Sequence, residues 1–140
     1  MLRAIMLGGL GAGIGDSVLA LVLYRVSLIA VYQSVASGLL GRAAFRGGLR
    51  SAALGCALHF TIATAAAAFY VLASRRAPVL VSRPAPCGLA YGVAVYFSMK
   101  YAVLPLSAVV RLTPFEPLAM VGHALLVGVP IALAAAYAAR

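Results

Sequence analysis

Long apolar runs dominate the hydrophobic pattern of this chain. Four of them cover residues 4–24, 51–74, 87–110 and 118–139. Each has about 20 residues or more, which is the length that a helix needs to cross the hydrocarbon core of a bilayer. Backbone groups in lipid must bond within their own segment, so such runs form helices. The pattern therefore predicts an all-α polytopic membrane protein, with four transmembrane helices in one bundle and a single domain over residues 1–140.

The segment 26–50 departs from this pattern. Its first part is apolar but short, and Arg42, Arg46 and Arg50 then recur every four residues. That spacing places the three arginines on one face of a helix. An amphipathic helix in the membrane interface, with its arginines on lipid phosphates, fits this arrangement. A re-entrant segment or a fifth span is the alternative, and Gly47-Gly48 predicts a break before the next span.

The composition excludes an ordinary soluble domain. Hydrophobic residues make up 65% of the chain and charged residues only 9%, against about 45–50% and about 25% in soluble proteins. A chain of 140 residues has too much surface for its volume to bury that apolar excess. The net charge of +9 comes mainly from arginines beside the apolar runs, where they contact lipid phosphates. The sequence has no basic patch interleaved with aromatics, so we expect the lipid bilayer as partner and not nucleic acid.

Glycines recur at four-residue intervals in two of the runs. Gly11 and Gly15 lie in the first run, and Gly88 and Gly92 begin the third. Small residues at this spacing allow helix backbones to approach closely in lipid. The pattern predicts close packing, within the bundle or against another chain.

One acidic, basic or histidine residue interrupts each run: Asp16, His59, Lys100 and His123. Counted from the membrane face that carries the first and third loops, they lie about 8–15 Å deep at about 1.5 Å per residue. All four thus occupy the same half of the bilayer, and a bundle is expected to bring them together. An ionisable group at such a depth costs about 2.5–3.5 kcal/mol and normally faces the interior with a partner. We therefore predict a pair between Asp16 and Lys100.

These features are compatible with three functions. The leading hypothesis is a non-enzymatic structural or accessory component of the envelope, which associates with itself or with a larger membrane complex. The second is a small oligomeric transporter or channel that uses Asp16, Lys100 and the histidines as a proton- or ion-coupled site. The third is haem binding through His59 and His123, and a zinc site that adds Asp16 has suitable ligand types.

Motifs typical of enzymes are missing from the sequence. It contains no Gly-rich phosphate loop, no Gly-x-Ser-x-Gly and no His-Glu-x-x-His. Each of these would supply a phosphate cradle, a nucleophile or a catalytic metal site. We accordingly expect no enzymatic activity, and no cofactor other than the haem considered above.

Several short motifs follow one another in the second half of the chain. They are Leu58-His59-Phe60, Tyr70, Gly88 with Gly92, Pro105-Leu106, Thr113-Pro114 and Gly122-His123. In order and spacing, residues 55–125 resemble the YagU-like family of bacterial inner-membrane proteins, which has no established activity. The resemblance implies a helical bundle in the bacterial inner (plasma) membrane, with His59 and His123 as shared polar positions. It implies no particular reaction.

Overall fold

A computed structural model describes residues 1–109 and 112–139 of the chain, and every element in these ranges is helical. The elements in chain order are α1 (Leu2–Tyr24), α2 (Leu28–Leu40), the 3₁₀ helix η1 (Gly41–Arg46), α3 (Gly48–Ser74), α4 (Val79–Ser82), α5 (Pro84–Ser98), the π-helix η2 (Met99–Val103), α6 (Pro117–His123), the π-helix η3 (Ala124–Gly128) and α7 (Val129–Ala138). The prediction of an all-α fold is confirmed.

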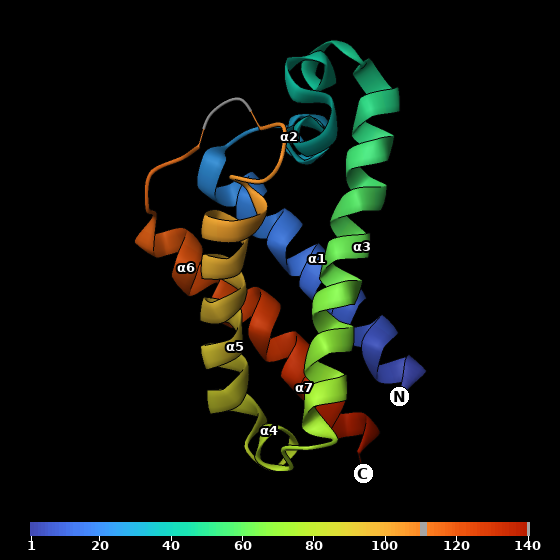
Figure 1. Cartoon of the computed structure of the whole chain (residues 1–140), viewed down its shortest axis with the longest axis vertical. Helices are drawn as coiled ribbons and strands as arrows, with labels where there is room; N and C mark the ends of the chain where they lie inside the picture. The colour runs from blue at the N-terminus through green and yellow to red at the C-terminus, as the bar shows by residue number, and fades with distance from the viewer. Residues whose placement is uncertain (110–111, 140) are drawn as a thin grey trace.

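The helices form an antiparallel bundle (Figure 1). α1, α3, α5 and the continuous α6–η3–α7 rod run lengthwise or obliquely through it, and successive members point in opposite directions. Both ends of the chain lie at one end of the bundle, whereas α2 and the connection between α5 and α6 lie at the other. This arrangement places the first and third loops on a common face, as the depth count in the sequence assumed.

Four helical stretches in the described part of the chain are long and apolar enough to cross a bilayer. They are Leu2–Tyr24, Leu28–Arg46, Gly48–Ser74 and Pro117–Ala138. The prediction of a multi-pass bundle with four such helices is therefore confirmed, but one of the four is not the expected one. The predicted third span, 87–110, corresponds to α5 and η2, which end at Val103. This helix is not one of the four stretches that are long and apolar enough to cross a bilayer. The predicted end of that span at Val110 lies outside the described residues.

The segment predicted to lie in the interface contains α2. Length and composition alone would allow Leu28–Arg46 to span. However, Figure 1 views α2 nearly end-on, so this helix runs across the long axis of the bundle. Its 13 residues are about 20 Å long at about 1.5 Å per residue, which is shorter than the hydrocarbon core. The crosswise placement is compatible with the expected interfacial helix, whose position relative to the membrane stays a prediction.

The predicted common face of the three arginines is wrong. Arg42 and Arg46 lie on the 3₁₀ helix η1, whereas Arg50 belongs to the first turn of α3. A 3₁₀ helix has three residues per turn, so a four-residue spacing does not align on one face. Gly41 and Gly48, each with φ of 57°, interrupt the chain on both sides in a conformation that glycine tolerates best. All three arginines are nevertheless exposed, so the predicted contact with lipid phosphates stays a prediction.

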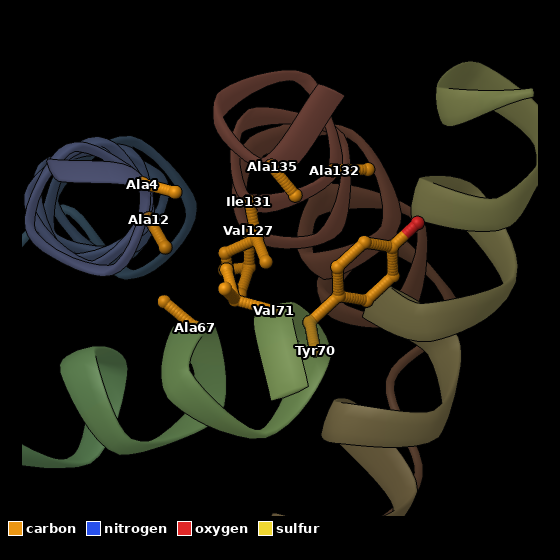
Figure 2. Packing of buried hydrophobic residues seen from close by; sticks show 9 residues of the cluster. All are labelled: Ala4, Ala12, Ala67, Tyr70, Val71, Val127, Ile131, Ala132 and Ala135. Atoms are coloured by element: carbon orange, nitrogen blue, oxygen red, sulfur yellow. The ribbon is translucent and has the colours of Figure 1, made fainter. Parts of the chain in front are cut away.

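A core of small residues closes the end of the bundle near the termini (Figure 2). It is formed by Ala4, Ala12, Ala67, Tyr70, Val71, Val127, Ile131, Ala132 and Ala135. We call this set the terminal core. Lipid offers little hydrophobic drive for helix association, so close van der Waals packing of small residues holds such helices together. Large apolar side chains such as Leu106, which is 88% exposed, cover the outside.

The predicted glycine positions lie at helix crossings. A Cβ on Gly88 would lie 2.9 Å from the carbonyl oxygen of Gly128, and one on Gly15 or Gly92 would meet the backbone of Leu126 or His123. Gly11 is less crowded, with its nearest neighbour the Pro130 side chain at 3.3 Å. These close approaches occur within the chain, so the glycine faces are already occupied and are not free for association with a partner.

Each π-helix lies just before a proline. η2 ends at Val103 ahead of Pro105, and η3 ends at Gly128 ahead of Pro130. Proline has no N–H, and its ring displaces the carbonyl four residues earlier, so a wider turn relieves the conflict. Lys100 lies in the first of these wide turns and His123 immediately precedes the second. The two prolines thereby help to position two of the predicted polar residues.

Candidate functional site

A cavity of about 300 Å³ lies between the helices, and all four predicted polar residues line it. Asp16 comes from α1, His59 from α3, Lys100 from η2 and His123 from α6. The rest of the lining is mostly small or apolar. The structure therefore brings residues from four separate helices around one space, and three of them form direct contacts.

Asp16 lies between the two histidines. Its Oδ1 is 3.3 Å from Nε2 of His123, and its Oδ2 is 3.9 Å from Nδ1 of His59. The exposed fractions of the side chains are 29% for Asp16, 18% for His123 and 10% for His59. We call these three residues the Asp16 cluster. His59 is its most buried member, and Asp16 faces the cavity.

The second nitrogen of each histidine bonds to a backbone carbonyl. His59 Nε2 lies 2.9 Å from the carbonyl oxygen of Gly13, and His123 Nδ1 lies 2.9 Å from that of Ala119. A carbonyl oxygen only accepts hydrogen bonds, so each of these nitrogens must carry a proton. In a neutral imidazole the other nitrogen is then bare. In both rings that other nitrogen is the one that faces Asp16.

A bare nitrogen and an ionised carboxylate are both acceptors and do not attract each other. The 3.3 Å contact between Asp16 and His123 is favourable when a proton lies on the carboxyl group or on the imidazole. In both cases the Asp16 cluster holds one proton more than an ionised aspartate with two neutral histidines. Its net charge is then zero, which reduces the cost of placing it in the membrane interior. The geometry would suit a proton shared between Asp16 and a histidine.

Ser17 and Tyr32 extend this network, and the sequence reasoning missed this role for both. The Ser17 hydroxyl donates to the Gly13 carbonyl at 2.8 Å, and its oxygen lies 3.3 Å from His59 Nε2 and 3.2 Å from the Tyr32 hydroxyl. Ser17 follows Asp16 directly in the sequence. Tyr32 lies in the segment assigned to the interface, and no pattern in the sequence connects it with His59.

The predicted pair between Asp16 and Lys100 is wrong. Lys100 Nζ instead donates to the carbonyl oxygens of Thr113 and Pro114, at 2.7 and 2.6 Å, and lies 5.9 Å from the centre of the Tyr96 ring. The connection between α5 and α6 is not helical there, so its carbonyls lack intrahelical partners and attract the ammonium group. Lys100 thus ties this connection to the cavity wall.

Glu116 is a further cavity residue that the sequence pattern did not reveal. Its Oε2 accepts a hydrogen bond of 2.6 Å from the Tyr24 hydroxyl, and its backbone N–H donates to the Tyr96 hydroxyl at 3.0 Å. It is half-buried and lines the same cavity as Asp16. Tyr24 at the end of α1 and Tyr96 on α5 thus hold it at the cavity.

The metal and haem hypotheses do not fit this geometry. Within residues 1–109 and 112–139, no three His, Cys, Asp or Glu side chains are arranged to hold a metal ion. A haem would need a free ring nitrogen of His59 and of His123 on its two faces. Both nitrogens that are not bonded to backbone point to the Asp16 carboxylate, which occupies the space between them.

Comparison with known proteins adds no relative: no protein-family model, no curated protein and no solved structure matches this chain. The similarity to the YagU-like family therefore stays a prediction from the motifs alone. The class of this protein is defined by its own fold and cavity, as a small multi-pass helical membrane protein with an interior cluster of ionisable residues.

Proposed function

We propose that this protein is a small proton-coupled membrane transporter in which the Asp16 cluster binds the coupling proton. One observation carries the proposal. A carboxylate from α1 lies between histidines from α3 and α6, at distances that a shared proton would make favourable, and all three line one cavity. Ionisable residues inside membrane helices typically mark ion or proton pathways because their desolvation is costly.

The cavity gives the proton site a place to act on a solute. Its volume of about 300 Å³ is at the lower limit of about 300–1,000 Å³ for small-molecule sites. Apolar side chains line most of it, and the Asp16 cluster, Glu116 and Lys100 provide charge. A solute bound there would lie beside the group that gains or loses the proton, which is the basis of coupling.

The wider assignments are part of the same proposal. We place the protein in the bacterial inner membrane on the basis of the YagU-like resemblance alone. We also expect a homo-oligomer, because a bundle of this size needs a second copy to enclose a complete pathway. The protein is proposed to be non-enzymatic.

An accessory structural role is the second candidate. The backbone-level packing of Gly15, Gly88 and Gly92 favours it, since tight helix crossings are what a rigid membrane component needs. In that case the Asp16 cluster would fix the register of α1, α3 and α6 without moving a proton, as buried polar groups do in some helical assemblies.

Proton flux into liposomes separates the two candidates. The purified chain is placed in phosphatidylcholine–phosphatidylglycerol vesicles that contain a pH-sensitive dye, and a potassium gradient with valinomycin drives the flux. We expect a flux above that of empty vesicles, and a loss of about tenfold or more in Asp16→Asn because the proton site is removed. The matched control is Thr61→Val, because Thr61 is exposed on the same helix as His59 and bonds only to its own helix.

The control variant is expected to conduct like the wild type. A wild-type flux no higher than that of empty vesicles, together with a lower melting temperature of Asp16→Asn, would support the structural role instead. Circular dichroism of each variant verifies that the helical fold is retained.

A further inference from the structure

We infer that a chain of hydrogen-bonding side chains leads the proton out of the Asp16 cluster towards α2, through His59, Ser17 and Tyr32. This inference rests on the proposed function and adds a route to it. The route starts at the cavity, passes between α1 and α3, and ends at the hydroxyl of Tyr32, which is not part of the cavity lining.

Two of the three steps along the route are short enough for a relay. His59 Nε2 and Ser17 Oγ are 3.3 Å apart, and Ser17 Oγ and the Tyr32 hydroxyl are 3.2 Å apart. The first step is the longest, with 3.9 Å between Asp16 Oδ2 and His59 Nδ1. A hydrogen bond needs about 3 Å, so the carboxyl group must turn away from His123 before it reaches His59.

Burial restricts this route to the named groups. Ser17 is 6% exposed and His59 9% exposed, and both are enclosed by the crossing of α1 and α3. Tyr32 is only partly exposed, and its ring lies 5.8 Å from the His59 ring. The hydroxyl of Tyr32 is the next polar group beyond Ser17, so a proton that leaves His59 on this side meets Ser17 and then Tyr32.

Close backbone packing holds α2 against this crossing. The carbonyl of Tyr32 lies so near to Gly55 of α3 that a Cβ at Gly55 would clash with it. Gly13, in turn, leaves room for the ring of Phe60, which packs edge-on against His59 at 5.4 Å. Gly55 on α3 therefore helps to position Tyr32, and Gly13 on α1 leaves room for the ring that packs against His59.

The transfer balances as a movement of one proton. Asp16 gives its proton to Nδ1 of His59, and the imidazolium releases the proton on Nε2 to the Ser17 oxygen. Ser17, whose own proton bonds to the Gly13 carbonyl at rest, turns that proton to the Tyr32 oxygen. Tyr32 then releases its phenolic proton to the membrane surface beside α2. Only O–H and N–H bonds form and break, so no oxidant or further reactant is needed.

The same contacts explain how His59 returns to its resting protonation state. After the transfer, His59 carries its proton on Nδ1, and its bare Nε2 faces the Gly13 carbonyl at 2.9 Å. Two acceptors at that distance repel each other. A ring flip, or the return of a proton to Nε2, restores the resting arrangement before the next cycle.

The test uses two variants in the liposome flux measurement described above. Tyr32→Phe removes only the hydroxyl and keeps the ring beside His59, and Ser17→Ala removes the middle group. We expect each to lower the flux by about tenfold or more, and the double variant to be no lower than the single ones because they block one route. Ser17→Thr keeps a hydroxyl and should restore the flux, which a purely structural role would not predict.

Tyr137→Phe is the matched control, because Tyr137 is 74% exposed on α7 and far from the route in sequence. If Asp16→Asn abolishes the flux while Tyr32→Phe and Ser17→Ala conduct like the wild type, the route is wrong and the proposed function stands. A wild type without flux overturns both.

A measurement on the unaltered chain covers the case in which the variants do not fold. Nitrogen-15 NMR of labelled histidine reports which ring nitrogen of His59 carries a proton. The route requires a protonated Nε2 at rest. A bare Nε2 on His59 would overturn the route, whatever the variants do.

Discussion

The terminal core and the polar cavity share α1, α3 and η3 but differ in the side chains that meet there. In the terminal core, Ala67 and Ile131 are 0% exposed, and all members except Tyr70 are small or aliphatic. In the cavity, side chains keep the helices apart, and Asp16 remains 29% exposed. Ala12 and Val127 belong to both regions and mark the boundary between them. The comparison shows that mostly small and aliphatic residues fill the terminal core, whereas ionisable residues from several helices line the cavity.

The largest effect on stability is expected from a change that forces the helices apart beside the terminal core. Gly88→Val places a branched side chain against Ala132 and the Gly128 carbonyl, both 2.9 Å from a Cβ at this position. We expect the free energy of unfolding to fall by about 3 kcal/mol, since overpacked sites of this kind lack room to relax. Thermal unfolding in detergent, followed by circular dichroism, measures the loss.

Ala90→Val on the same helix is the control for this change. Ala90 is exposed, so its variant should remain within about 0.5 kcal/mol of the wild type. Equal stability of Gly88→Val and Ala90→Val would show that the helices do not cross as closely as described.

A smaller effect is expected where Lys100 ties the connection between α5 and α6 to the cavity. Lys100→Met removes the bonds to the Thr113 and Pro114 carbonyls. We expect a loss of about 1–2 kcal/mol, because the site is partly exposed and water replaces the lost bonds in part. Lys100→Arg keeps a charged donor and should recover part of this loss.

Amide hydrogen exchange sharpens this test. It is expected to accelerate around residues 113–116 in Lys100→Met and to stay unchanged in the terminal core. Unchanged exchange around residues 113–116 would mean that Lys100 does not hold the connection.

The smallest effect is expected for Tyr24→Phe. This change removes the hydrogen bond of 2.6 Å to Glu116 and leaves the ring in place. One hydrogen bond to a charged group at a half-buried site contributes about 1 kcal/mol. Thermal unfolding of Tyr24→Phe beside Tyr137→Phe, whose hydroxyl is exposed, checks the difference. If the two variants melt at the same temperature, the bond to Glu116 does not contribute.

Much of the fold and the centre of the site were accessible from the sequence because both depend on position along a helix. The depth of a residue in the membrane follows from the rise per residue, so Asp16, His59 and His123 were expected near one another, and they do line one cavity. The bundle then had only to bring α1, α3 and α6 together. The same depth count placed Lys100 in this layer, and it does line the cavity.

The errors arose where direction and distant contacts decide the outcome. Depth does not tell which way a side chain points, so the bonds of Lys100 to the Thr113 and Pro114 carbonyls were not foreseen. Tyr32 joins the network through the crossing of α2 with α3, which depends on Gly55 and not on a local pattern. The prediction that three arginines share one helical face was wrong because two glycines with positive φ interrupt the helix.

The central claim is that the Asp16 cluster holds a shared proton, and nitrogen-15 NMR of His123 tests it most directly. The measurement compares the labelled wild type with Asp16→Ala in lipid bilayers at neutral pH. We predict that Nε2 of His123 in the wild type carries or shares a proton, and that this signal changes to that of a bare nitrogen in Asp16→Ala. A bare Nε2 in the wild type, unaffected by the substitution, would contradict the account.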